Sequence, residues 1–552
     1  MPRKPNFMIV ITDQQSGHPY WPEGWEEENL PAMRRLKENG ITFNRAYTNS
    51  CTCSPARVTM LTGLYPAQHG VTEVLEFDNV QRVVSDLTSD PDNPDNPGNP
   101  TSNLALNIKE RRQRGMPSNL QNLAKILRTA GYNVIFKGKW HLTKPANWVK
   151  DPAKEIDQKY WTKVDAQQLA ERYGFDGWTW PDAGDNLKIE NMGAGSTKND
   201  QRFIDGRGQA AKYGDVPYDI LEPESVVHFL KTYDSDKPFC LIVSLVNPHD
   251  VLAYPTTYKQ AGYNDADFQH LPIDRPPTWD EDLSTKPRAQ AEFRVVANQG
   301  NGQIGEEDTD LQLGYCRFYA YLCKHVDQQI LEVLQALDAS RHADNTVVVR
   351  IADHGDMAMS HGLQRQKMFN MYEETLNVPF VISNPNLFKH CRGAQTDSLV
   401  SLIDLLPTLA NLAGVPDLDR WVFKGKDLSP ILSNPSAEVQ NHIHFTYEDL
   451  YFFVPSANHM RTIVEKRWKY AVYYDIYADA PFEYEMYDLA VPRDVREVEN
   501  LGNPNVQVSG EVAAERERLH QKLIHIMETL GTFPHEIEWP KHWGEQRNAK
   551  GE

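Results

Sequence analysis

Short apolar runs rich in β-branched residues alternate with helical patterns along most of this chain. The apolar runs lie at Phe7–Thr12, Asn133–Phe136, Phe239–Val246 and Thr346–Ile351. The helical patterns lie at Pro31–Asn39, Ser118–Ala130, Pro223–Thr232, about Leu311–Leu337 and Ser401–Gly414. Strands that alternate with helices are typical of a parallel sheet covered by helices. We therefore predict an α/β fold with a largely parallel central sheet sandwiched by helices.

The pattern changes after about residue 440, where short aromatic runs such as "HIHFTYEDLYFF" and "FEYEMYDL" appear. These runs predict antiparallel strands, followed by a helix at about Gly510–Leu530. We expect a main domain at 1–435 and a smaller α+β subdomain at 436–552. Segments near 76–117, 150–215 and 252–308 interrupt the main domain and are predicted to be irregular insertions. The first includes a Pro/Asn/Asp-rich loop at Asp90–Pro100.

The chain is acidic, with 57 Lys and Arg against 76 Asp and Glu and a net charge of −19. This balance argues against nucleic acid or an anionic membrane as the main partner, but it leaves a small anionic ligand open. No apolar stretch is long enough to span a membrane or to form the core of a signal peptide. The six cysteines show no spacing typical of a disulfide framework. We therefore expect a cytoplasmic protein.

Polar side chains follow each of the four predicted strands. In an open α/β sheet, ligands bind beyond the carboxyl ends of the strands, so these side chains are expected to meet at one edge. Taken singly, an Asp here is more often a helix cap and a His is more often a satisfied surface or core residue. Four such strand ends together predict a site. They carry Asp13 and Gln14, Lys139 and His141, His249, and Asp353 and His354.

Two kinds of chemistry are expected at this edge. Asp13, Gln14, Asp353 and His354 offer carboxylate, amide and imidazole ligands that suit one divalent cation. We expect Ca²⁺ first, with Mn²⁺ or Mg²⁺ as alternatives. Positive charge and hydrogen-bond donors are expected from Arg57, Lys139 and Lys367 together with His141 and His249. Cations around a hard metal ion predict a pocket for a tetrahedral oxyanion, either sulfate or phosphate.

The segment Cys53-Ser54-Pro55-Ala56-Arg57 resembles the C-x-P-x-R signature of the type I sulfatases, within the alkaline phosphatase superfamily. The following "VTMLTGLYPAQHG" is also similar to that family. Cys51 cannot begin the motif because position 53 is not proline. Further likeness extends along nearly the whole chain, at "GKWHL", "NPHD", "ADHGDMAMSHGLQRQKMFNMYEETLNVPFVI", "RWKYAVYY" and "EMYDL".

The resemblance implies that a formylglycine-generating enzyme oxidises Cys53 to formylglycine (3-oxoalanine). One hydroxyl of the hydrated aldehyde would attack the sulfur of a small-molecule sulfate ester, and the other would lose its proton to expel sulfate. Residue 53 would then face the metal beside its four ligands. The resemblance implies that Arg57 holds the hydroxyls of the nucleophile and that Lys139 and Lys367 bind the sulfate oxygens. It makes His249 the acid for the leaving alcohol and His141 the base, two roles that could be exchanged.

One departure from the family pattern affects the substrate. Many sulfatases carry Asp-Asp and Asp-Asn where this chain has Asp13-Gln14 and Asp353-His354. That variant resembles the choline-sulfatase and phosphonate monoester hydrolase branch. A phosphonate monoester or phosphodiester hydrolase is therefore the first alternative. The second is a non-catalytic oxyanion-binding protein with Cys53 left as a thiol. The organic part of the substrate and any homo-oligomeric assembly stay open.

Overall fold

The computed structural model describes residues 3–75, 114–145, 161, 163–180, 182, 197–206, 224–449, 454–476 and 480–546. The predicted loop at Asp90–Pro100 lies outside these residues. So do positions 76–113 of the first predicted insertion and parts of the second.

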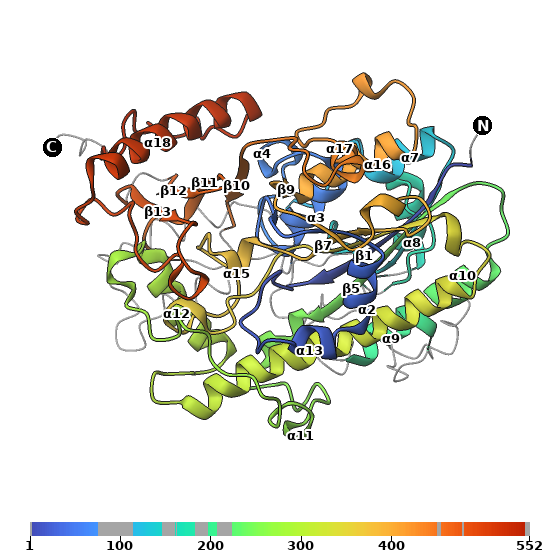
Figure 1. The fold of residues 1–552 in the computed structure, drawn as a ribbon, viewed down its shortest axis with the longest axis horizontal. Helices are drawn as coiled ribbons and strands as arrows, with labels where there is room; N and C mark the ends of the chain where they lie inside the picture. The colour runs from blue at the N-terminus through green and yellow to red at the C-terminus, as the bar shows by residue number, and fades with distance from the viewer. Residues whose placement is uncertain are drawn as a thin grey trace.

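A seven-stranded sheet forms the centre of the main domain, in the order β4-β5-β1-β6-β7-β2-β8 (Figure 1). Neighbouring strands β4, β5, β1 and β6 are parallel, and β7 runs antiparallel to both β6 and β2. The strands are β1 (Asn6–Asp13), β2 (Gly40–Phe43), β4 (Asn133–Gly138), β5 (Phe239–Pro248), β6 (Thr346–Ala352), β7 (Phe380–Ser383) and β8 (Ala394–Thr396). The predicted fold class is confirmed.

The central strand β1 is buried on both faces, which explains its continuous apolar sequence. Phe7, Ile9 and Ile11 pack into one core with α3 (Cys53–Thr62), α7 (Leu123–Thr129) and α16 (Leu405–Leu412). Met8 and Val10 pack into the opposite core with α2 (Pro31–Glu38), α10 (Val226–Thr232) and the long α13 (Thr309–Asp338). Alternate side chains of a strand point to opposite faces, so each face receives its own helical layer.

Three helices are shorter than the sequence predicted, because a capping residue sets where two of them begin and a 3₁₀ turn precedes the third. Asn122 accepts a hydrogen bond from Lys125 N at 3.0 Å, so α7 begins at Leu123. Ser225 caps α10 in the same way. Before α16, residues Leu402–Asp404 form a 3₁₀ turn with a capping box on Ser401. Polar caps of this kind satisfy the free N–H groups of a first helical turn.

The prediction of irregular insertions was wrong where helices form within them. The longest of these helices are α8 (Lys163–Tyr173), α9 (Thr197–Asp205) and α12 (Arg288–Asn301). In α12, Ala289, Phe293 and Ala297 are buried at intervals of four residues, which is the helical repeat. The prolines that precede this helix mask the repeat in the sequence.

A separate four-stranded antiparallel sheet forms the C-terminal part, as predicted. Its order is β10 (Ile443–Tyr447), β11 (His459–Val464), β12 (Trp468–Tyr474) and β13 (Glu483–Asp488). Helix α18 (Gly510–Leu530) begins at the cap Ser509 and packs Leu519 and Leu523 against Tyr470 of this sheet. The boundary near residue 435 stays a prediction. In the described part of the chain, no helix is both long and apolar enough to cross a membrane.

Candidate active site

The neighbouring strands β1 and β6 end side by side and carry three of the predicted site residues to one place. Thr12 pairs with Ala352 in the parallel register, so Asp13 and the pair Asp353-His354 emerge at the same edge. Cys53, the first residue of α3, lies at the same edge, in contact with Asp13 and His354. The sheet topology therefore brings together predicted site residues from segments more than three hundred residues apart in the chain.

Four ligand-type atoms face a common point in this site. His354 Nε2 lies 3.2 Å from Cys53 Sγ and 3.6 Å from Oδ1 of both Asp13 and Asp353. Cys53 Sγ lies 3.6 Å from Asp13 Oδ1. All four side chains are buried. Separations of this size are those expected between ligands of one ion bound at about 2.0–2.6 Å.

His354 is held in the form that a metal ligand needs. Its Nδ1 lies 3.1 Å from Gly355 O, which favours a proton on Nδ1 and a lone pair on Nε2. Burial lowers the pKa of His354 to about 4, so the ring is neutral at physiological pH. The two carboxylates and this neutral imidazole fit a divalent cation.

Arg57 bridges the two carboxylates of the site. Its Nε donates to Asp353 Oδ2 at 2.8 Å, and its Nη2 donates to Asp13 Oδ2 at 3.0 Å. Its Nη1 donates to Ser244 Oγ and to Lys139 O. A planar guanidinium can make these contacts in fixed directions, so Arg57 orients both carboxylates while their Oδ1 atoms face the ligand point.

Lys139 and Lys367 also lie in the site, and each already has a partner there. Lys139 Nζ lies 2.6 Å from Asp13 Oδ2, and Lys367 Nζ donates to Gln14 Oε1 at 2.5 Å. Burial alone raises the pKa of Asp13, but Lys139 and the other nearby cations more than offset it and hold that pKa well below its ordinary value. Asp13 is therefore ionised.

The two predicted histidines have unpaired ring nitrogens within the described part of the protein. Both nitrogens of His141 and Nδ1 of His249 are buried without a hydrogen-bond partner there. Burial, reinforced by Lys139, lowers the pKa of each histidine well below its ordinary value. Two neutral rings with free nitrogens beside a cationic pocket are suited to proton transfer with a bound ligand.

Two functional contacts were missed by sequence reasoning. Ser244 accepts from Arg57 and donates to Lys139 O at 2.8 Å. Its only sequence signal is a single hydroxyl inside an otherwise apolar strand. Asp356 accepts from Gln14 Nε2 at 2.6 Å and thereby turns Gln14 Oε1 toward Lys367. The sequence shows Asp356 at the end of "ADHGD", but it does not show that Gln14 is its partner.

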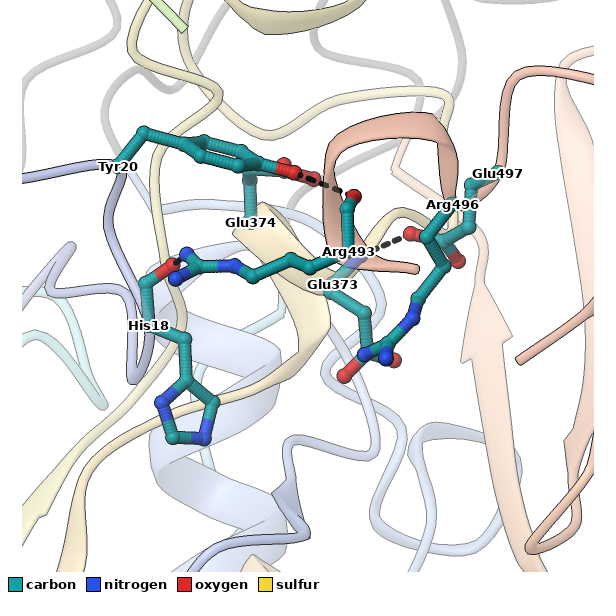
Figure 2. Close-up of a pocket in the computed structure, with 7 residues that line it drawn as sticks. All are labelled: His18, Tyr20, Glu373, Glu374, Arg493, Arg496 and Glu497. Atoms are coloured by element: carbon teal, nitrogen blue, oxygen red, sulfur yellow. Dashed lines mark hydrogen bonds between the residues drawn. The ribbon is translucent and has the colours of Figure 1, made fainter. Parts of the chain in front are cut away.

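A cavity of about 230 Å³, outside the candidate active site, lies between the segment after β1 and residues near 493–497 (Figure 2). Figure 2 shows Arg493 reaching past Tyr20 to the backbone carbonyl of His18. Tyr20 Oη in turn donates to Arg493 O at 3.0 Å. None of the predicted site residues lines this cavity. Its contacts join the segment after β1 to the part of the chain that follows the C-terminal sheet.

Beside that cavity, His361, Glu374 and Glu497 form a second group of ligand-type residues. Positive charge is already supplied there, because Lys469 Nζ lies 2.5 Å from Glu497 Oε1 and 2.6 Å from Glu373 Oε1. We interpret this group as a buried ion-pair network.

Two family models match this chain. The family model described as Sulfatase matches residues 5–415, and the model described as N-sulphoglucosamine sulphohydrolase, C-terminal, matches residues 360–528.

Among similar proteins, an ulvan-active sulfatase of Formosa agariphila is 24% identical over 439 residues, covering 79% of this chain and 66% of that protein. A choline-sulfatase of Rhizobium meliloti is 24% identical over 484 residues, covering 85% of this chain and 78% of that protein. The solved phosphonate monoester hydrolase of Agrobacterium radiobacter has a TM-score of 0.60 at 18% identity, with 96% of both chains covered. The chain therefore belongs to the sulfatase family of sulfuric ester hydrolases, within the alkaline phosphatase superfamily.

Proposed function

We propose that this protein hydrolyses small-molecule sulfate monoesters with a formylglycine formed from Cys53 and one divalent cation. The observation that carries the proposal is the position of Cys53. Its Sγ belongs to the C-x-P-x-R motif and lies 3.2 Å from His354 Nε2 and 3.6 Å from Asp13 Oδ1. The motif's reactive position therefore meets the metal-type residues in one buried site.

Asp13, Asp353 and His354, together with residue 53, would hold the cation. Gln14 would join them through the second lone pair of its Oε1, which also accepts from Lys367. Ca²⁺ is the first expectation, with Mn²⁺ and Mg²⁺ as alternatives. Bound there, the cation would supply Lewis-acid stabilisation of the negative charge that develops on the sulfuryl oxygens. Arg57 donates to Oδ2 of both aspartates and so directs their Oδ1 atoms at that point.

The unmodified thiol is a poor nucleophile in this environment. Burial, reinforced by Asp13, raises the pKa of Cys53 to about 12, so the thiol stays protonated. Conversion by a formylglycine-generating enzyme would supply an aldehyde hydrate, with one hydroxyl to accept the sulfuryl group and another to expel it. This chemistry also explains why one particular cysteine is placed at the ligand point.

The remaining residues act on the ester itself. Lys139 and Lys367 bind the sulfate oxygens, because an ammonium group has three donors and the contacts to Asp13 and Gln14 each use one. The negative charge of the bound ester favours a protonated His249, which then donates its proton to the leaving alcohol, and His141 accepts the proton that releases sulfate. The two roles can be exchanged, and the unpaired nitrogens on both rings support either assignment.

A second function is favoured by the residues that depart from the common sulfatase pattern, Gln14 and His354. A phosphonate monoester or a phosphodiester carries one negative charge at neutral pH, as a sulfate monoester does. A phosphate monoester carries nearly two, since its second pKa is about 6. The same pocket therefore suits a sulfate monoester, a phosphonate monoester and a phosphodiester, which all carry one negative charge. A third function, oxyanion binding without catalysis, would leave Cys53 as a thiol.

The test compares kcat/KM for a matched aryl sulfate, aryl phenylphosphonate and diaryl phosphate on one preparation. Mass spectrometry of the peptide that contains Cys53 first establishes that the residue is converted. We expect the sulfate to be the best substrate. A phosphonate or diester value more than about tenfold higher, equal to about 1.4 kcal/mol of transition-state stabilisation, would assign the second function. An unconverted, inactive but sulfate-binding protein would assign the third.

A further inference from the structure

Two buried aspartates from the segment 150–215 each hold the backbone of a strand end that carries a candidate active-site histidine. Asp182 contacts the end of β4, which leads to His141. Asp200, in α9, contacts the end of β5, which leads to His249. The sequence predicted this segment only as an irregular insertion.

Asp182 accepts hydrogen bonds from two consecutive backbone groups. Its Oδ1 accepts from Trp140 N at 2.7 Å, and its Oδ2 accepts from His141 N at 2.6 Å. His141 has a left-handed backbone with φ 52°, which a residue other than glycine adopts only when its surroundings hold it there. Asp182 is buried, so water does not compete for these bonds. The carboxylate therefore fixes the backbone from which the imidazole projects.

Asp200 makes the same arrangement at the other strand end. Its Oδ1 accepts from Val246 N at 2.7 Å, and its Oδ2 accepts from Asn247 N at 3.0 Å. The side chain is completely buried. His249 follows two residues after Asn247, at the start of a 3₁₀ turn. Bonds from N–H groups to an ionised carboxylate are about twice as strong as neutral ones, so each pair makes a firm anchor.

We propose that Asp182 and Asp200 are positioning residues that hold His141 and His249 where proton transfer requires them. This inference rests on the proposed function, because it assigns the histidines to the hydrolysis. Each carboxylate accepts from backbone N–H groups at a strand end, so each acts through the histidine that follows its strand. A small displacement of a catalytic group lowers the rate far more than it lowers substrate binding.

Asp327 provides a matched control within the same chain. It is also buried, and it accepts from Ala32 N at 2.8 Å and from Met33 N at 2.9 Å. Burial raises the pKa of Asp182, Asp200 and Asp327 to about 6, 7 and 6. Asp327 holds the beginning of α2, which carries no candidate site residue. Asp327→Asn therefore changes the same kind of buried carboxylate, with two backbone N–H donors, but leaves the backbone beside His141 and His249 unchanged.

The experiment is a pair of double-mutant cycles at about pH 8, where all three carboxylates are ionised. Asp182→Asn is measured in the wild-type and His141→Ala backgrounds, and Asp200→Asn in the wild-type and His249→Ala backgrounds. In the wild-type background we expect kcat on an aryl sulfate to fall at least about tenfold, with KM changed by less than about threefold. In the matching His→Ala background the same substitution should change kcat by less than about twofold. Asp327→Asn should leave kcat within about twofold.

Equal losses in both backgrounds, or no loss in either, would overturn the inference, because a general structural effect does not depend on the histidine. An equal loss in Asp327→Asn would also overturn it. If an Asn variant does not fold, the corresponding Asp→Glu variant enters the same cycle, since it keeps both acceptor oxygens but displaces them. The wild-type rate separates the two hypotheses: an inactive, fully converted wild type refutes the proposed function, whereas an active wild type with additive cycles refutes only the positioning.

Discussion

Lys367 Nζ donates to the side-chain oxygen of Gln14 at 2.5 Å, and both side chains are buried in the candidate active site. The opposite end of the Gln14 amide is also fixed, because its Nε2 donates to Asp356 Oδ2 at 2.6 Å. An amide satisfies both neighbours at once, since it has an acceptor for the lysine and donors for the carboxylate. This explains why Gln fits the position that follows Asp13 in this chain.

Replacement of Gln14 by Glu should therefore destabilise the protein. The new carboxylate would lie against Asp356, and the free energy of unfolding should fall by about 1–3 kcal/mol at pH 8. Burial raises the pKa of Asp356 to about 6 even in the wild type. The destabilisation should shrink near pH 5, where one carboxyl of the pair is protonated. Urea unfolding at both pH values measures it, with Gln335→Glu on the exposed face of α13 as the control. An equal loss at both pH values would contradict the explanation.

The two neighbouring cysteines should respond differently to substitution. Cys53 Sγ faces the ligand point, whereas Cys51 Sγ donates to the backbone carbonyl of Lys367 at 3.1 Å. Cys53→Ala should abolish turnover and keep the fold, because the aldehyde precursor is lost. Cys51→Ala removes only a packed thiol and should retain most activity. Turnover and circular dichroism of both variants check this, and an active Cys53→Ala would show that the site is wrongly assigned.

Removal of the metal should abolish activity reversibly. Asp13, Asp353 and His354 have no role in the proposed chemistry except to hold the cation and the nucleophile. Exhaustive chelation should remove turnover, and Ca²⁺, Mn²⁺ or Mg²⁺ should restore it to different extents. Asp353→Asn should lower the metal content, while Asp327→Asn should leave it unchanged. Elemental analysis accompanies each assay, and a fully active metal-free preparation would refute a metal-dependent mechanism.

The sheet and the ligand point were predictable because both follow from local pattern. Asp13 and Asp353 stand directly after apolar runs, and parallel strands deliver such residues to one edge. Asp356, Asp182 and Asp200 were not predictable in the same way. Their partners are backbone groups or an amide far away in sequence, and a lone buried Asp has no periodic signal. The short strands β2 and β8 were missed because three or four residues cannot display a repeat.

The buried ion-pair network beside the cavity lined by Arg493 should make stability depend on pH. His361 Nδ1 lies 2.6 Å from Glu281 Oε2, and its Nε2 lies 3.5 Å from Glu374 Oε2. Burial lowers the pKa of His361, but Glu374 and Glu281 more than offset it and raise that pKa to about 9. A histidine in the unfolded chain titrates near 6.5. The protonated ring therefore contributes stability fully below about pH 6.5, and this contribution is lost as the pH rises through about 9.

His361→Gln should remove that dependence. Between pH 6.5 and pH 9, the wild type should lose more unfolding free energy than the variant, by an amount on the order of 3 kcal/mol at most. Urea unfolding at several pH values gives the two curves, and His270→Gln, at an exposed position, should follow the wild type. Glu281→Gln should move the wild-type loss to lower pH, because one of the two carboxylates that hold the proton is gone. Parallel curves for the wild type and His361→Gln would show that the ring is not protonated in the folded protein.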